Sequence, residues 1–347
     1  MAGFFTSASS WPRLARALLL VAAGTATAGA APAYTNLYVF GDSLSDVGND
    51  FTVTGGAVPT ASFYSQGRFS NGPTYADQLA AGLGLGPLLP SVAGGTDYAF
   101  GGARVAGVAA GLPPTALSFN QQLAAYGSAH ASADAGGLYL LWIGANDMSD
   151  ALGQAALGNA AAVPAAINTT LTALGTAIQG LAAKGATHFL IPDLPDLSLI
   201  PAARAQAQGD AGTLATIKFV SQSFNGALAG MLANPGFASL DIHTLDVFSL
   251  QNAATAGAYG FSNVTDACYS GGVNGLPLTP GGPAPTVCAD PGSYLYWDYE
   301  HPSAALHAVL GAEALAAAVP EPSSALLLLP GLLVVATMRR WKTPRHA

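Results

Sequence analysis

The chain has 347 residues and a formal net charge of −8 at pH 7, and 51% of its residues are hydrophobic against only 9% charged. This length allows one large domain or two small ones. The acidic balance argues against a nucleic-acid-binding protein, which needs a basic surface, and against adsorption to anionic membranes. Few basic residues lie between the two ends of the chain: Arg68, Arg104, Lys184, Arg204 and Lys218.

Residues 1–30 have the form of a secretory signal peptide. Arg13 and Arg16 precede an apolar run at residues 17–23, and the small residues at 28–30 match a cleavage site. The alternative is a buried N-terminal helix, but no acidic residue occurs before Asp42. The pattern therefore predicts that the folded part of the chain lies outside the cytoplasm.

The first predicted strand leads directly into the first candidate catalytic residue. Residues 37–40 are all apolar, as in a parallel strand covered by helices on both faces, and Gly41-Asp42-Ser43 follows them. A serine hydroxyl becomes an effective nucleophile when a neighbouring imidazole takes its proton. We expect a tight turn into a helix at Ser43, whose free N–H groups would stabilise the negative oxygen formed by attack on a carbonyl. An ordinary N-cap serine is the alternative.

Two further segments carry groups that can stabilise such an oxyanion. Residues 97–103 are glycine-rich, and a glycine lets a backbone N–H approach a substrate oxygen closely, although a plain turn has the same composition. Residues 137–143 predict a second buried strand, and Asn146 follows it. Losing one side-chain donor to an oxyanion costs about 2.7–4 kcal/mol of transition-state stabilisation. A turn asparagine is the alternative interpretation.

Strands and helices alternate along the rest of the chain. A third strand is predicted at residues 187–191, and three alanine- and leucine-rich segments predict helices: 161–184, 214–232 and 303–318. This alternation predicts a parallel sheet with helices on both faces, in one domain over residues 31–318. Ligand sites in such sheets lie at the carboxyl ends of the strands, where we expect three residues that follow predicted strands: Ser43, Asn146 and Asp193.

Residues 248–293 differ from the rest of the domain. They are rich in glycine, proline and asparagine, and we expect a long, partly irregular insertion near the site. The insertion contains both cysteines of the chain, Cys268 and Cys288. An even cysteine count in an exported protein favours a disulfide, although two free thiols are the alternative.

Near the end of the domain, Asp298 and His301 stand three residues apart. At this spacing the carboxylate can bond one ring nitrogen, which fixes the tautomer and stabilises the imidazolium. With Ser43 they supply a nucleophile, a general base and a group that orients the base. Four other histidines are assigned structural roles: His130, His188, His243 and His307.

Residues 319–347 form a distinct tail. Pro320-Glu321-Pro322 leads into an apolar stretch at 325–336, and a basic cluster follows at 339–342. The stretch is short for a full membrane span, which needs about 20 residues. The tail resembles the PEP-CTERM sorting signal of bacterial surface and matrix proteins. That resemblance implies a hydrophobic transmembrane helix, processing by an exosortase-type transpeptidase, and a final location at the cell surface or in the extracellular matrix. A plain C-terminal membrane anchor is the alternative.

The catalytic candidates lie in motifs whose order resembles the GDSL esterase/lipase family, also called the SGNH hydrolases. The resemblance spans residues 35–318 and rests on five segments: 40–49, 67–73, 98–103, 144–147 and 298–302. It implies that Ser43 is the nucleophile, His301 the general base and Asp298 the residue that orients it. It also implies an oxyanion hole made of the Ser43 and Gly102 backbone N–H groups and the Asn146 side chain.

The same resemblance implies an α/β fold, namely a three-layer α/β/α sandwich with a flavodoxin-like, mainly parallel sheet. The family usually has asparagine where this chain has Asp97, which leaves Gly101 as an alternative to Gly102. Residues 192–196 resemble a family loop beside the site, and a structural proline turn is an equal interpretation.

We therefore predict an exported serine ester hydrolase that needs no metal or cofactor. Its predicted partner is a small-molecule, lipid or polysaccharide ester, with no nucleic acid. Two alternatives are an acyltransferase that uses the same triad and a non-catalytic surface or matrix protein on the same fold. An intact set of catalytic residues argues against the second alternative.

Overall fold

The computed structural model describes residues 34–110, 112–273 and 284–319. The predicted signal peptide and the predicted sorting tail from residue 320 onward lie outside these residues. One compact unit, Tyr34–Ala318, contains everything discussed below. Within the described ranges, no helix combines the length and the apolar character that crossing a membrane requires.

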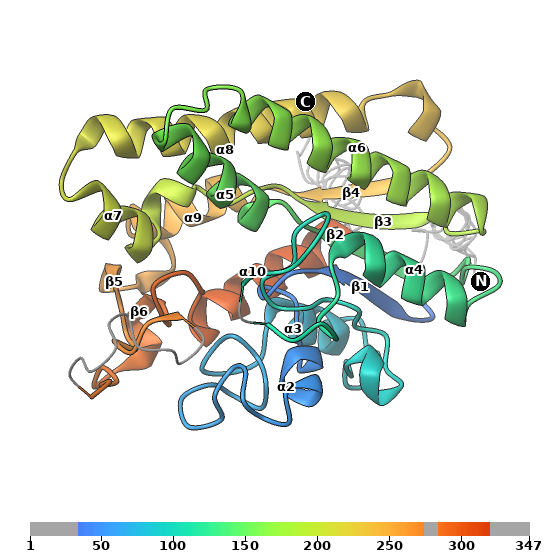
Figure 1. Ribbon diagram of the computed structural model, residues 1–347. Coiled ribbons are helices and arrows are strands. Elements are labelled where there is room, and N and C mark those ends of the chain that lie inside the picture. The colour runs from blue at the N-terminus through green and yellow to red at the C-terminus, as the bar shows by residue number, and fades with distance from the viewer. Residues whose placement is uncertain (1–33, 111, 274–283, 320–347) are drawn as a thin grey trace, which may run out of the picture. The chain divides into compact units, whose positions relative to one another are not determined.

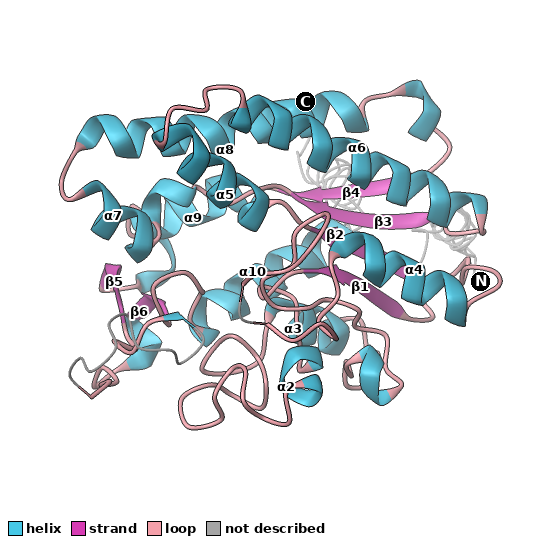
Figure 2. Ribbon diagram, viewed as in Figure 1, coloured by secondary structure: helices cyan, strands magenta, loops and turns pink. Residues whose placement is uncertain are grey.

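The centre of the unit is a four-stranded parallel sheet, whose first two strands are apolar and whose fourth, at the edge, is largely polar (Figure 2). Every residue of its first two strands is buried, as expected for strands that are covered on both faces. The strands pair in the order of the chain: β1 (Leu37–Gly41), β2 (Leu138–Trp142), β3 (His188–Pro192) and β4 (Asp241–Leu245). The three predicted strands therefore match β1 to β3 within two residues, whereas β4 was not predicted.

A further extended segment, residues 96–100, runs parallel to β1 on the side away from β2. The Val39 N–H donates to the Thr96 carbonyl (3.1 Å), and the Tyr98 N–H donates to the Val39 carbonyl (2.8 Å). The segment therefore stands second in the chain but outermost in space, which is the strand order of a flavodoxin-like sheet. It also delivers the glycine-rich residues that follow it to the same edge as Ser43.

Helices cover both faces of the sheet, which gives three layers (Figure 1). Four of them pack on one face: α4 (Phe119–Ala129), α5 (Ala145–Ala156), α6 (Ala162–Ala183) and α8 (Ala211–Leu232). On the other face lie α3 (Tyr75–Gly82) and α10 (Ala304–Ala318), which pack against each other. The remaining helices are shorter: α2 (Asn49–Val53), α7 (Pro201–Ala207) and α9 (Val247–Thr255).

Side-chain alternation along the strands explains the two cores. Phe40, Leu141 and Phe189 point toward α4, α5, α6 and α8 and belong to the main cluster of buried residues. Trp142 points to the opposite face, where its ring meets Tyr75 of α3 edge-on at 5.1 Å. Burying one such side chain contributes about 1.5–3 kcal/mol, so both faces hold the sheet between helices. The expected α/β/α sandwich is confirmed.

The segment at residues 248–293 is more regular than expected. Its first part belongs to helix α9. The buried residues of α9 recur at helical spacing and form one face of the helix: Val247, Leu250, Gln251 and Ala254. Beyond α9, β5 (Asn263–Ala267) pairs in parallel with β6 (Tyr294–Tyr296). Residues 274–283 lie outside the described part of the chain.

A disulfide joins Cys268 and Cys288 and clamps this segment, with 4.8 Å between the Cα atoms. Beside it Tyr269 stacks on Trp297, with 5.8 Å between ring centroids, and Tyr64 meets Trp297 edge-on at 6.3 Å. This small aromatic cluster fixes the chain directly before residue 298, at the edge of the sheet where Ser43 lies.

Candidate active site

Ser43 lies in a single turn directly after β1. The Ser45 and Asp46 N–H groups both donate to the Asp42 carbonyl, at 3.0 and 3.1 Å, but no helix continues from this turn. The expected helix start at Ser43 is therefore wrong, and α2 begins only at Asn49. The Asp46 carboxylate is the reason, since it accepts the Gly48 and Asn49 N–H groups and so competes with helical hydrogen bonding.

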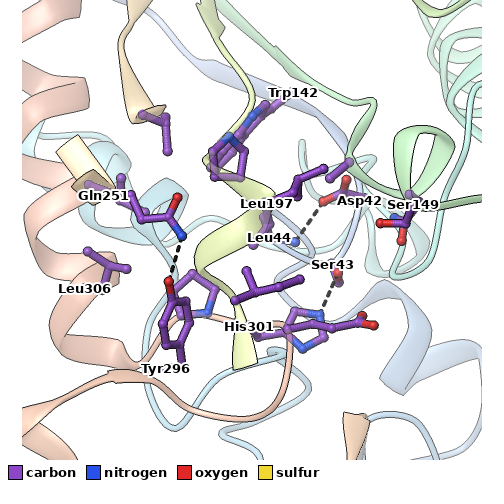
Figure 3. A pocket seen from close by; sticks show the side chains of 18 residues that line it. Asp42, Ser43, Leu44, Trp142, Ser149, Leu197, Gln251, Tyr296, His301 and Leu306 are labelled. Carbon is purple, nitrogen blue, oxygen red and sulfur yellow. Dashed lines mark hydrogen bonds between the residues drawn. The ribbon is translucent and has the colours of Figure 1, made fainter. Parts of the chain in front are cut away.

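The Ser43 hydroxyl, the His301 ring and the Asp298 carboxylate form a continuous hydrogen-bonded chain. Ser43 Oγ is 2.8 Å from His301 Nε2, and His301 Nδ1 is 2.8 Å from Asp298 Oδ2. Figure 3 shows the labelled Ser43 and His301 side chains pointing toward each other. The structure thus joins residues 258 positions apart in the sequence.

Asp298 is held more firmly than its bond to histidine alone would require. Its Oδ1 accepts the Glu300 and His301 N–H groups at 2.8 and 2.7 Å, and its Oδ2 also accepts the Tyr64 hydroxyl at 2.6 Å. These bonds tie the short loop to the carboxylate that it carries. Tyr64 comes from a separate loop and was not identified from the sequence, because nothing in its neighbourhood indicates a distant partner.

Burial and neighbouring charge act in opposite directions on the two titrating groups. Burial lowers the pKa of His301, but the carboxylates of Asp298, Glu300 and Asp42 outweigh it and leave that pKa above its ordinary value. Burial raises the pKa of Asp298, but the His301 ring, the Tyr64 hydroxyl and the Glu300 amide outweigh it, and the pKa of Asp298 falls. The pair therefore favours an ionised aspartate beside a basic imidazole.

Three N–H groups were expected from the sequence to form an oxyanion hole, and the structure shows which of them are free to donate. Of the three residues, Ser43 and Asn146 line the same cavity. Within the described residues, the backbone N–H groups of Ser43 and Gly102 donate to no other group. The Gly101 N–H, by contrast, donates to Asp46 Oδ2 at 3.1 Å. This difference favours Gly102 over Gly101 as a donor. Asn146 lies in the first turn of α5 and donates one side-chain hydrogen to the Ala103 carbonyl at 3.1 Å, which leaves its second hydrogen available.

Gly102 has a backbone conformation that other residues rarely adopt. Its φ is +64°, and a Cβ at this position would lie 2.7 Å from the Ala109 Cβ. Glycine meets both requirements because it has no side chain. The position of the Gly102 N–H therefore depends directly on this residue type.

The segment after Ser43 contains a group of buried carboxylates. Asp46 accepts four backbone N–H groups, from Gly48, Asn49, Asp50 and Gly101. Asp50 is also fully buried, and its oxygens form no well-aligned hydrogen bond among the described residues, although the nearby Gly101 N–H offsets part of its pKa shift. Burial, reinforced by the charge of Asp46, raises the pKa of Asp50 to about 8. Burial likewise raises the pKa of Asp46 to about 6 and that of Asp42 to about 7.

A cavity opens beside Ser43 and extends into the protein (Figure 3). Its rim carries exposed polar residues, Ser149 and Glu300. Its inner wall is buried and mostly apolar, with Trp142, Leu197, Val247, Leu306 and Leu310. A wall of this kind fits a hydrocarbon chain better than a polar group. Helix α9 supplies part of the wall, which the sequence interpretation of residues 248–293 did not anticipate.

The loop at residues 192–196 both lines the cavity and anchors neighbouring helices. Pro195 lines the cavity. Asp193 accepts the Phe248 N–H at 3.1 Å, and buried Asp196 pairs with Lys218 at 2.9 Å. The two aspartates thus hold α9 and α8 in place, and the proline faces the site.

The other histidines make structural contacts elsewhere in the fold. His307 accepts the Tyr75 N–H at 3.2 Å, and burial lowers its pKa to about 3, so it stays neutral. His188 bonds Asp241 at 2.8 Å across the β3–β4 pair. Among the described residues, no group of three or more histidine, cysteine, aspartate or glutamate side chains is arranged to hold a metal ion.

Comparison with known proteins identifies a family whose model matches this chain. The family model for GDSL-like lipase/acylhydrolase proteins matches residues 37–314. Lipase 1 of Photorhabdus luminescens is 35% identical over 174 residues, a match that covers 49% of this chain but only 24% of that protein. Phosphatidylcholine-sterol acyltransferase of Aeromonas hydrophila is 27% identical over 338 residues, and that match covers 84% of this chain and 92% of the acyltransferase.

A solved structure is also similar in part. It is a member of the lipolytic G-D-S-L family from Veillonella parvula, 14% identical in sequence, with a TM-score of 0.35. The match covers 66% of this chain and 87% of that structure.

Proposed function

The chain belongs to the GDSL-like lipase/acylhydrolase family, and from this premise we propose that it is a serine ester hydrolase acting through an acyl-enzyme. The observation that carries the proposal is the unbroken line of hydrogen bonds from Ser43 through His301 to Asp298. Nucleophile, general base and orienting carboxylate need this order and these distances to act together.

In the proposed reaction, Ser43 Oγ attacks the ester carbonyl while His301 Nε2 takes the hydroxyl proton. The carbonyl electron pair moves to oxygen and returns when the bond to the alcohol breaks. His301 then gives its proton to the leaving alcohol, which departs and leaves the acyl group on Ser43. Water repeats the sequence and releases the acid. Asp298 stays ionised throughout and holds the imidazole in the tautomer that presents a free Nε2.

The negative oxygen formed in each half of the reaction needs donors that are already in place. We assign this role to the Ser43 and Gly102 backbone N–H groups and the free side-chain hydrogen of Asn146. Since these donors are anchored by their own loops, the enzyme would spend little energy on reorganising them as charge develops.

We place the acyl group of the substrate in the cavity beside Ser43. The acyl group stays attached to the enzyme through both steps, whereas the alcohol must leave to solvent. The buried, apolar inner wall suits the acyl group, and the exposed rim at Ser149 and Glu300 suits the departing alcohol. The proposal therefore includes lipid esters among the substrates.

Export is a further part of the proposal. The disulfide between Cys268 and Cys288 is consistent with an oxidising compartment, where such bonds persist. The signal-like residues 1–30 and the sorting-like tail at 319–347 support a bacterial surface or matrix protein handled by an exosortase-type transpeptidase. Mass spectrometry of the mature protein would test this, because it would show both ends removed.

The catalytic proposal is tested with nitrophenyl esters of increasing acyl length. We expect measurable release of nitrophenol by the wild type, and a fall of about 10⁴-fold or more in kcat for Ser43→Ala. Turnover by Ser43→Ala equal to the wild type would contradict the proposal and favour a non-catalytic protein on this fold. Circular dichroism of the two proteins controls for misfolding.

Transfer of the acyl group to an alcohol is the second candidate function. It is favoured by the relative named phosphatidylcholine-sterol acyltransferase, which aligns with 84% of this chain. The chemistry differs only in whether water or an alcohol attacks the acyl-enzyme. Adding acceptor alcohols, including a sterol, and measuring new esters against released acid would separate hydrolysis from transfer.

A further inference from the structure

The inner end of the cavity contains a buried polar pair, Gln251 and Tyr296, among apolar neighbours. Both line the cavity, yet only 4% of Gln251 and 1% of Tyr296 is exposed. Figure 3 shows the two side chains joined by a hydrogen bond, at the end of the cavity away from Ser43. Leu306 and Leu310 complete the wall around them.

Helix α9 and strand β6 bring this pair together. Gln251 lies one helical turn after Val247, so both side chains project from α9 on the same side and both line the cavity. The next residue, Asn252, points elsewhere and bonds Lys218 and Asp196. Tyr296 is the last residue of β6, two positions before the catalytic loop begins at Asp298.

The hydrogen bonds of the pair are incomplete. Gln251 Nε2 donates to the Tyr296 hydroxyl at 2.8 Å, but the buried Gln251 Oε1 accepts from no group among the described residues. The Tyr296 hydroxyl accepts this bond and donates to no acceptor within the same residues. Burial raises the pKa of Tyr296, so its proton stays on the oxygen. One free acceptor and one free donor therefore lie side by side in the wall of the cavity.

Such an arrangement is unfavourable in the empty protein. A buried polar group without a partner loses its hydrogen bonds to water and gains none in return, and a leucine in place of Gln251 would avoid that cost. A single hydroxyl group satisfies both open positions, because it donates to Gln251 Oε1 and accepts from Tyr296. The result is a closed ring of three hydrogen bonds.

We propose that this cavity selects esters whose acyl chain carries a hydroxyl group, which Gln251 and Tyr296 recognise. The inference rests on the proposed function, since it assumes that the acyl group of the substrate occupies the cavity. It places recognition at the end of the cavity farthest from the reacting carbonyl. A polar site of this kind discriminates strongly against substrates that lack the matching group, because its own polar atoms are then left unpaired.

The test compares matched nitrophenyl esters of straight-chain acids, with and without a hydroxyl on the acyl chain, and with the hydroxyl moved along the chain. We expect one hydroxyl position to raise kcat/KM by about tenfold or more over the unsubstituted ester of the same length. Equal kcat/KM for all members of the series would overturn the inference while leaving the ester hydrolase proposal intact. No turnover of any ester would instead contradict the proposed function itself.

Two variants separate recognition from general damage. In Gln251→Met, which keeps the side chain's length and removes the amide, the preference for the hydroxylated ester should fall to about one, because kcat/KM for that ester falls more than kcat/KM for the unsubstituted ester. Tyr296→Phe should act in the same direction. Retention of the preference in both folded variants would overturn the inference.

A third variant is the matched control. Leu310→Met alters the apolar wall without touching a hydrogen bond, so it should change kcat/KM for both esters together and leave their ratio unchanged. A second series, with the hydroxyl on the leaving alcohol, tests whether the recognised hydroxyl belongs to the acyl part or the alcohol part of the ester. A preference there but not on the acyl chain would also overturn the inference.

Discussion

A loop and a short helix near the site, the loop that carries Asp298 and helix α2 that carries Asp50, differ in how they accommodate a buried carboxylate. Asp298 in the loop before α10 and Asp50 after the Ser43 turn are both 0% exposed. Asp298 bonds His301, Tyr64 and two backbone N–H groups, and its pKa lies below the ordinary value. Asp50 forms no well-aligned hydrogen bond among the described residues and faces Asp46, and its pKa rises to about 8.

The comparison shows that burial alone does not determine the charge of a carboxylate. Desolvation raises the pKa of both residues, and the neighbours decide the outcome. The loop of Asp298 keeps a negative charge, which would stabilise the imidazolium in the proposed reaction. Helix α2 keeps the neutral acid Asp50 near the anionic Asp46, and Asp46 accepts the Gly101 N–H next to the proposed oxyanion donor Gly102.

The largest expected effect comes from disabling the charged loop. Asp298→Asn keeps the shape of the side chain but removes the charge and favours the wrong histidine tautomer. We expect kcat to fall by about 10⁴-fold with the thermal unfolding temperature little changed. Steady-state kinetics with a nitrophenyl ester measures this, and activity within tenfold of the wild type would show that the loop has only a structural role.

Asn146 belongs to neither segment. Replacing it tests whether catalysis also needs a donor from outside them. In Asn146→Ala one oxyanion donor is lost, and we expect kcat to fall by about 10²–10³-fold with KM nearly constant. A rise in KM at unchanged kcat would instead assign Asn146 to ground-state binding. Asn225→Ala serves as a control, since Asn225 bonds the backbone of Leu194 and does not line the cavity.

The buried Asp50 of helix α2 leads to a prediction about stability. Because the native pKa of Asp50 exceeds the unfolded value of about 3.9, the native state binds more protons, and the free energy of unfolding falls as pH rises from about 4 to about 8. Asp50→Asn mimics the protonated form. It should therefore stabilise the protein at pH 8 by about 1–3 kcal/mol and leave stability near pH 4 unchanged.

Urea unfolding at the two pH values measures the difference. Asp210→Asn is the control, because Asp210 is exposed and its pKa is lowered by hydrogen bonds to Thr213 and Gly212. It should gain no stability as pH rises. Destabilisation by Asp50→Asn at both pH values would mean that Asp50 is charged in the native protein.

The smallest effect concerns the edge of the charged loop. The carboxylate of Glu300 contributes to the upward shift of the His301 pKa. Activity requires neutral His301, so kcat/KM should fall with acid around a pKa above the ordinary 6.5. Glu300→Gln should move this acid limb to lower pH by less than about one unit. A limb that does not move would exclude Glu300 as a source of the shift.

Much of this organisation follows from local sequence. The apolar runs before Gly41, before Gly144 and before Asp193 identified three strands, because a strand buried on both faces has no polar positions. The residues proposed to be catalytic lie in short motifs, and the order of these motifs along the chain suggested their roles. Helix α9 was missed because one of its four buried positions is the polar Gln251 and because it directly precedes a stretch rich in glycine and proline.

What the sequence did not reveal depends on contacts between distant segments. Tyr64 lies 234 positions from Asp298, and no local pattern connects them. The Gln251–Tyr296 pair likewise joins a helix to a strand 45 positions later. The sequence also suggested a helix at Ser43, where the Asp46 side chain instead captures the backbone N–H groups that a helix would use. Side-chain competition of this kind is decided by geometry.

The central claim is that Ser43 is the residue that His301 activates. Treatment with a fluorophosphonate followed by peptide mass spectrometry tests it directly, because such reagents form a stable bond only with an activated serine. We predict a single adduct on the peptide that contains Ser43, formed in the wild type and strongly slowed in His301→Gln. An adduct on another serine such as Ser149, or ester turnover that continues after Ser43 is fully modified, would contradict the account.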